Sequence, residues 1–224
     1  MVKPYPDAEL SASAEDVHIP PVGLPGRLEL PPRCIGVVAF AHGSGSSRLS
    51  PRNTRVAAAL RRSGLGTLLF DLLTPGEDED RRNVFDIALL SERLLHATAW
   101  MRSHGASGAL PIAYFGASTG AAAALVAAAR SGNEIAAVVS RGGRPDLAGD
   151  ALGSVRAPTL LIVGGYDTDV LALNRAAAAR LRCEKELVVV EGATHLFEEP
   201  GTLDAAIEHA RRWFVRHFPT RREA

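Results

Sequence analysis

The feature that most constrains the fold is a regular alternation of short apolar runs with longer segments of helical periodicity. The runs hold four to six residues each and cover 35–40, 66–71, 112–115, 135–140, 159–164 and 187–190. They lack an alternation of apolar and polar residues, which is typical of strands buried on both faces. Between them, helical spacing occurs at about 53–63, 84–103, 118–130, 171–181 and 202–217. The order predicts an α/β fold with a mainly parallel sheet and helices on both faces.

Two features outside this core refine the prediction. The short segments 17–19 and 27–30 flank a turn rich in proline and glycine, so we expect an antiparallel hairpin at the sheet edge. The acidic segment 76–82 is expected to be a solvated loop.

Only 18 residues separate Ser140 from Thr159, which is enough for a turn and one short helix. We therefore expect no lid domain.

Size and charge limit the classes of function. With 224 residues, the chain is expected to form a single domain, with edge strands in 1–33 and a catalytic core in 34–218. Its 46% hydrophobic and 22% charged residues are typical of a soluble globular protein. The 25 basic residues balance the 25 acidic ones, so we do not expect nucleic acid as a partner.

The same sequence gives expectations about location. The N-terminal residues contain no apolar core of a signal peptide, and the longest apolar run, 121–129, is too short to span a bilayer. Cys34 and Cys183 form no close pair and no metal-binding spacing, so we expect reduced thiols and a cytoplasmic protein without membrane contact.

A polar Ser-Thr pair interrupts the apolar stretch 112–129. The sequence Gly-Ala-Ser-Thr-Gly at 116–120 fits the pattern G-x-S-x-G, with a predicted strand before it and a predicted helix after it. Such a turn forces the serine into a strained backbone conformation, and glycines two positions away on either side avoid collisions. Serine also caps helices, so a structural role for Ser118 stays open at this point. We interpret Ser118 as a candidate nucleophile.

A serine nucleophile needs a histidine base and a third group that orients the base. Of the seven histidines, His195 follows a strand and a turn and so lies at a strand's carboxyl end; most of the others are expected on helices or an edge strand. Asp167 follows the strand 159–164 through a Gly-Gly turn, with Asp169 as the rival acid. Asp167 is preferred because it is closer to the strand end. The chain order Ser118, Asp167, His195 is that of α/β-hydrolases.

The loop after the first buried run predicts an oxyanion hole. It reads His42-Gly-Ser-Gly, and its glycines let the backbone approach a substrate carbonyl. We predict the backbone amides of Ser44 and Thr119 as the donors, and a structural role for His42. A flexible turn is the alternative.

Arginines near the strand ends are candidates for substrate binding. Arg48 follows the oxyanion loop, and Arg141 and Arg144 follow the strand 135–140. Each could bind a substrate carboxylate, and each could instead pair with a local aspartate or be solvated.

Together these motifs resemble the α/β-hydrolase superfamily and, within it, the dienelactone hydrolase-like group. The resemblance runs from about Cys34 to Phe214 and rests on HGSGS, GASTG, GGYDTDV and GATHLF. It implies about eight strands with the first pair antiparallel, and a triad of Ser118, His195 and Asp167. Dienelactone hydrolases proper use a cysteine nucleophile, whereas this chain has a serine.

These observations favour hydrolysis of small soluble carboxylic esters through an acyl-enzyme on Ser118. We expect a small-molecule ester as substrate, no metal or organic cofactor, and a monomer or homodimer, with Trp213 and Phe214 packed in the core. An acyltransferase or peptidase with the same triad, or a non-catalytic binding module, remains the alternative.

Overall fold

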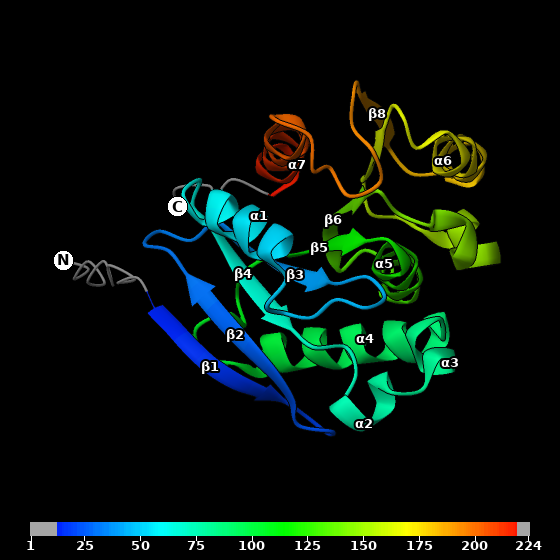
Figure 1. Ribbon diagram of the computed structural model, residues 1–224. Coiled ribbons are helices and arrows are strands. Elements are labelled where there is room, and N and C mark those ends of the chain that lie inside the picture. Colours follow the sequence, from blue (N-terminus) through cyan, green and yellow to red (C-terminus); the bar gives the residue numbers. More distant parts are fainter. Residues whose placement is uncertain (1–12, 219–224) are drawn as a thin grey trace.

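The computed structural model describes residues 13–218, whose eight strands form one sheet (Figure 1). Its strand order is β1-β2-β4-β3-β5-β6-β7-β8. The strands are β1 Ser13–Ile19, β2 Leu24–Leu30, β3 Gly36–Ala41, β4 Leu65–Phe70, β5 Ile112–Ala117, β6 Ile135–Arg141, β7 Thr159–Gly164 and β8 Lys185–Val190. Strand β2 pairs antiparallel with β1 and β4, and all other pairs are parallel. The predicted fold class, including the antiparallel first pair, is confirmed.

Helices cover both faces of the sheet (Figure 1). They are α1 Pro51–Arg61, α2 Pro75–Asp78, α3 Arg81–Val84, α4 Ile87–Ser103, α5 Thr119–Arg130, α6 Thr168–Arg180 and α7 Thr202–His217, with a 3-10 helix, η1, at Pro145–Ser154. Helices α1 and α7 contribute to one apolar cluster, and α4, α5 and α6 contribute to the other. Within residues 13–218 no separate lid domain covers the sheet, and η1 is the short helix expected between β6 and β7.

The central strands show why their sequences lack polar alternation. In β3, Val37 and Ala39 pack in the cluster with α4 and α5, while Val38 and Phe40 pack in the cluster with α1 and α7. Both faces of the strand therefore require apolar side chains. Burial of apolar surface on the two faces is the main source of the sheet's stability.

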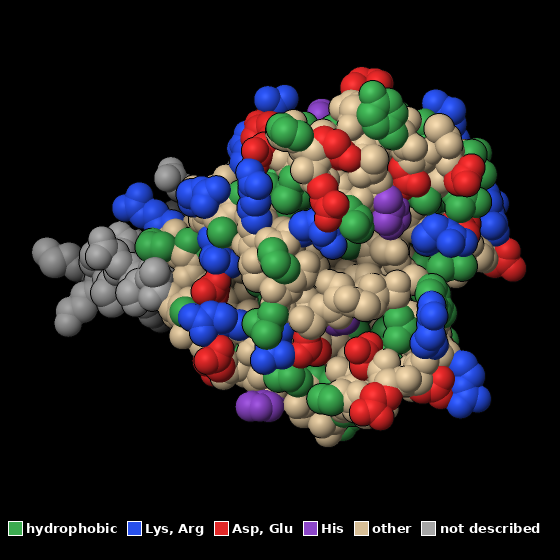
Figure 2. All heavy atoms as spheres, in the orientation of Figure 1, with side chains coloured by type: hydrophobic (Ala, Val, Ile, Leu, Met, Phe, Trp, Pro, Cys, Tyr) green, Lys and Arg blue, Asp and Glu red, His purple; other side chains and the backbone are tan. Residues whose placement is uncertain are grey.

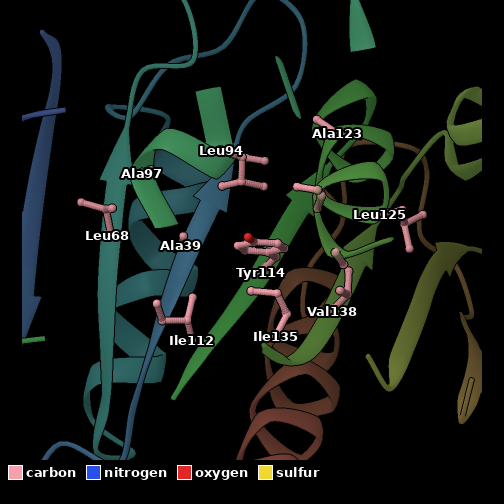
Figure 3. Packing of buried hydrophobic residues seen from close by; sticks show 14 of the residues in the cluster. Ala39, Leu68, Leu94, Ala97, Ile112, Tyr114, Ala123, Leu125, Ile135 and Val138 are labelled. Atoms are coloured by element: carbon pink, nitrogen blue, oxygen red, sulfur yellow. The ribbon is translucent and has the colours of Figure 1, made fainter. Parts of the chain in front are cut away.

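Figure 3 shows the cluster beneath α4 and α5. Leu94 and Ala97 of α4 lie on its apolar face, and Tyr114 of β5 stands at the centre of the view. The Tyr114 hydroxyl is 2.7 Å from the Thr98 hydroxyl, so its polar end has a partner inside the core. Burial raises the pKa of Tyr114 to about 12.

Helix α5 lies unusually close to the sheet because its first half is made of small residues. Ala121, Ala122, Ala123 and Ala124 are completely buried. A Cβ added to Gly120 would lie 2.1 Å from the carbonyl oxygen of Ala41 in β3. The alanine-rich sequence of this segment therefore has a packing function.

The prediction of a solvated loop at 76–82 is wrong. Helix α2 begins with a capping box, in which Thr74 Oγ1 accepts from the Glu77 amide and the Glu77 carboxylate accepts from the Thr74 amide. The side chain of Asp80 caps α3 through the Arg82 amide. The acidic side chains stabilise two short helix starts.

Other boundaries differ from the prediction by a few residues. Helix α4 starts at Ile87 because Asp86 caps it, with its side chain accepting from the Leu89 amide. Trp213 and Phe214 of α7 are buried, as predicted for core residues. In the described part of the chain, no helix combines the length and apolar character needed to cross a bilayer.

The contact between α5 and β3 gives a stability prediction. We expect Gly120→Ala to lower the free energy of unfolding by about 2 kcal/mol or more, because the new methyl group collides with the backbone oxygens of Ala41 and His42. Urea denaturation followed by circular dichroism measures this change. The control is Gly105→Ala, whose added Cβ meets nothing within 4 Å and should change stability by less than about 0.5 kcal/mol. Equal stability of the two variants would contradict this packing.

Candidate active site

Loops from several strand ends meet around a cavity of about 200 Å³. Ser44, Arg52, Ser118, Arg141 and His195 are among the residues that line it. They come from the loop after β3, the start of α1, the turn after β5, the end of β6 and the loop after β8. In Figure 2, the middle of the visible face is mostly tan, the colour of backbone and uncharged polar side chains, with a histidine (purple), basic (blue), acidic (red) and hydrophobic (green) side chains around it. Ligands of open α/β sheets bind at this carboxyl edge.

Ser118 occupies a strained turn between β5 and α5. Its φ is 51° and its ψ is −123°, a conformation that is rare for a residue with a side chain. As N-cap of α5 it makes no side-chain capping hydrogen bond, which removes the simplest structural reason for a serine here. The strained backbone predicted for this serine is confirmed.

The flanking glycines permit this turn. A Cβ on Gly116 would lie 2.4 Å from Cα of Ala121, and one on Gly120 would collide with the end of β3. Gly43 contacts the serine itself, since its added Cβ would be 2.8 Å from Ser118 Cβ. Only glycine fits these positions, as the motif predicts for the first two.

His195 is hydrogen-bonded to Asp167. The distance between His195 Nδ1 and Asp167 Oδ2 is 2.6 Å, and the Asp167 side chain is 15% exposed. Asp167 is the N-cap residue of α6 but makes no capping hydrogen bond with its side chain. The carboxylate fixes the ring so that Nε2 is available for proton transfer. Asp169, in the first turn of α6, makes no hydrogen bond or ion pair with His195.

Ser118 and His195 line the same cavity, but no hydrogen bond joins them in residues 13–218. Hydrogen bonds between catalytic groups are often long in unliganded enzymes and shorten when substrate binds. The structure thus brings together all three predicted residues and forms one of the two hydrogen bonds expected between them.

The loop that carries His195 is held by a carboxylate that the sequence analysis did not identify. Glu199 accepts from the Thr194 amide at 3.1 Å and from the Thr194 hydroxyl at 2.6 Å. The hydroxyl bond is the main reason why the pKa of Glu199 is lowered. On the other side of the loop, Gly142 approaches so closely that an added Cβ would be 2.9 Å from the His195 carbonyl oxygen. These contacts restrict the position of the imidazole.

Of the two amides predicted for the oxyanion hole, that of Ser44 already has an acceptor in the structure. Thr119 is the first residue of α5, so its amide has no acceptor within the helix. The Ser44 amide, by contrast, donates to Thr119 Oγ1 at 3.1 Å. The Ser44 amide, which is the second predicted donor, therefore already has an acceptor, because the Thr119 hydroxyl reaches the loop after β3.

His42 has the structural role that was predicted for it. Its Nε2 accepts from the Leu72 amide at 3.0 Å, so the proton is on Nδ1, which lies 3.1 Å from the Gly43 carbonyl oxygen. Burial lowers the pKa of His42, which keeps the ring neutral. The ring thereby joins the oxyanion loop to the segment after β4.

The three candidate arginines differ in their surroundings. Arg48 forms an ion pair with Asp71, and Arg144 forms a bidentate pair with Asp146 at 2.8 and 2.9 Å. Neither lines the cavity, so the geometry does not support them as substrate-binding residues. Arg141 does line the cavity and makes no ion pair within residues 13–218.

Arg52 and Asn53 at the start of α1 also line the cavity and were missed. The sequence contains a signal that could have identified these two residues. Ser50-Pro51 is a helix start, with serine as N-cap and proline at the first helical position. A helix that begins soon after an oxyanion loop directs its first turn toward the same site.

Comparisons with known proteins agree with this geometry. No family model matches the chain. A crystal structure of a dienelactone hydrolase from Anabaena variabilis is 51% identical, with a TM-score of 0.89, and the match covers 93% of this chain and 99% of that one. Est1E from Butyrivibrio proteoclasticus is 16% identical, with a TM-score of 0.76 over 92% of this chain and 99% of its own. This second likeness supports the fold alone.

A curated relative from Mycobacterium tuberculosis carries the name "Putative phosphoribosyl transferase". It is 58% identical over 197 residues, which are 88% of this chain and 44% of the relative. The chain therefore spans less than half of the length of the curated relatives that it matches.

The 51% identity to the Anabaena protein extends over nearly the whole of both chains, so the two proteins are members of one family. The strand order, the turn at Ser118 and the pair of His195 with Asp167 are consistent with it. The chain belongs to the dienelactone hydrolase-like group of the α/β-hydrolase superfamily, a group of hydrolases.

Proposed function

We propose that the chain is a serine hydrolase that cleaves small soluble carboxylic esters through an acyl-enzyme on Ser118. The observation that carries this proposal is that the strained turn of Ser118 opens onto the cavity that His195 also lines. His195 is in turn bonded to Asp167 at 2.6 Å. A nucleophile, a base and an acid that orients the base are the groups that acyl transfer requires.

In the proposed mechanism, Ser118 Oγ attacks the ester carbonyl carbon while His195 Nε2 takes the serine proton. The tetrahedral intermediate collapses, the bond to the leaving oxygen breaks, and His195 gives its proton to the departing alcohol. Water then attacks the acyl-enzyme by the same steps and releases the carboxylic acid. Asp167 stays ionised and stabilises the imidazolium throughout.

The oxyanion is proposed to bind the amides of Thr119 and Ser44. The Ser44 amide exchanges its 3.1 Å bond to the Thr119 hydroxyl for the stronger bond to the charged oxygen. Each such donor should contribute about 3 kcal/mol of transition-state stabilisation.

The curated name of the mycobacterial relatives does not lead us to propose phosphoribosyl transfer for this chain. More than half of those relatives' length lies outside the match. The groups in the cavity here suit acyl chemistry. An acyltransferase or peptidase uses the same groups, and the fraction of product formed with an added alcohol or amine instead of water separates these activities.

The bond between Asp167 and His195 predicts different effects for two neighbouring carboxylates. We expect Asp167→Asn to lower kcat for p-nitrophenyl acetate by about 10³-fold to 10⁴-fold, because the amide disfavours the required imidazole tautomer. Asp169→Asn is the matched control and should retain nearly full activity, since the His195 ring is hydrogen-bonded to Asp167 and not to Asp169. If Asp169→Asn lost activity and Asp167→Asn kept it, Asp169 and not Asp167 would be the acid that orients His195.

The volume of the cavity predicts a preference for short acyl chains. Its volume is about 200 Å³, and Leu196 is the one large apolar side chain in its described lining, so a long acyl chain finds little apolar surface to contact. We expect kcat/KM to fall at least tenfold from p-nitrophenyl acetate to p-nitrophenyl octanoate. Equal or rising values along the series would contradict a small substrate. Ser118→Ala measures the background of non-catalytic hydrolysis in both assays.

A further inference from the structure

Arg141 is a buried cation without a counter-charge beside the candidate nucleophile. It is 7% exposed, ends β6 and lines the cavity together with Ser118. Its Nε and Nη1 atoms have no hydrogen-bond partner within residues 13–218. Arginines with only a structural role are normally paired, as Arg48 and Arg144 are with their aspartates.

The guanidinium stays charged in this position. Burial and the nearby charge of Arg52 lower the pKa of Arg141 to about 10, which still leaves it protonated at neutral pH. The rings of Phe115 and Phe197 lie 6.0 and 5.9 Å from its guanidinium carbon. These cation-π contacts stabilise the charge in part but leave its hydrogen-bond donors unused.

A second cation and a helix start face the same cavity. Helix α1, with 11 residues, begins at Pro51, which has no amide proton, so Arg52 and Asn53 carry its first amides. The Asn53 amide has only a long contact, 3.5 Å, with Ser50 Oγ. The Arg52 side chain is 34% exposed and pairs with Glu198 at 3.1 Å. Helix N-termini carry a partial positive charge that favours anions.

Positive charge predominates among the residues that line the cavity. Its described lining includes Arg52, Arg141 and the start of α1 but no aspartate or glutamate. The pair between Arg52 and Glu198 offsets Arg52 only in part, because the Glu198 side chain is 63% exposed, and a single carboxylate ligand would then offset Arg141 alone. A phosphate group carries close to two negative charges at pH 7, and its tetrahedral oxygens can accept from several donors at once. Ser46 and Ser50 also line the cavity.

We propose that Arg141, Arg52 and the N-terminus of α1 form a phosphate subsite, and that the substrate is a small ester with a phosphate group near the scissile carbonyl. The substrate class rests on the ester hydrolysis proposed above, whereas the binding of phosphate does not. Because Ser118 lines the same cavity of about 200 Å³, the phosphate and the scissile carbonyl must be only a few atoms apart in the substrate.

Binding is tested first, without catalysis. Methyl phosphate and acetate are titrated into the full Ser118→Ala chain by isothermal calorimetry at pH 7.5. We expect methyl phosphate to bind at least tenfold more tightly than acetate. Arg141→Met should weaken the binding of methyl phosphate at least tenfold, because methionine keeps most of the side chain's bulk and removes the charge. Arg52→Gln should weaken this binding severalfold. If Arg141→Met does not fold, the Arg52→Gln variant alone provides the test.

The matched control for binding is Arg55→Gln. Arg55 is one turn further along α1, pairs with Asp204 and does not line the cavity. Its substitution changes the net charge as Arg52→Gln does and should leave methyl phosphate binding unchanged. Equal weakening by all three substitutions would mean a general charge effect and would overturn the subsite. Tighter binding of acetate than of methyl phosphate would overturn the choice of phosphate.

Turnover is tested with matched pairs of esters. Methyl phosphoglycolate is compared with methyl glycolate, and 2-acetoxyethyl phosphate with 2-acetoxyethanol. In at least one pair we expect the phosphorylated ester to have a kcat/KM at least tenfold higher, and Arg141→Met to abolish the difference. Equal turnover without phosphate binding overturns the subsite and leaves the hydrolase intact. Phosphate binding that depends on Arg141, with no turnover of any ester, supports the subsite and contradicts the proposed function.

Discussion

The architecture of the site depends on the close contact between helix α5 and strand β3. Gly120 lets the helix start against the end of the strand, and this position forces Ser118 into a backbone conformation with φ 51°. The strain is maintained by the buried alanines of α5 and by the apolar clusters on both faces of the sheet. Packing far from the cavity thus determines where the serine hydroxyl is presented.

Around this turn, the loops are positioned by local hydrogen bonds. Neutral His42 joins the oxyanion loop to the segment after β4, and Glu199 fixes the loop of His195 through Thr194. Asp167 then orients the imidazole. The buried guanidinium of Arg141 differs from these groups because it has no counter-charge within residues 13–218, and a buried charge without a partner is costly in a folded protein.

Much of this could be predicted from the sequence, because strong local patterns coincide with the fold. The buried strands, the G-x-S-x-G turn and the positions of Asp167 and His195 follow from periodicity and chain order. What could not be predicted depended on particular side-chain contacts, some of them between distant segments. The capping box of Thr74 with Glu77 and the cap from Asp80 turned an acidic run into two short helices. The bond from the Ser44 amide to Thr119 and the different pairing of three similar arginines required the three-dimensional arrangement.

The proposed chemistry depends on Ser118 being a nucleophile that His195 activates. The most direct measurement is labelling of the folded protein with a fluorophosphonate, in which the serine oxygen bonds to phosphorus and fluoride leaves, followed by peptide mapping. We expect one adduct on Ser118, which His195→Ala abolishes and which His209→Ala, a substitution on α7, retains. No adduct on the folded chain, or an adduct that persists without His195, would contradict it.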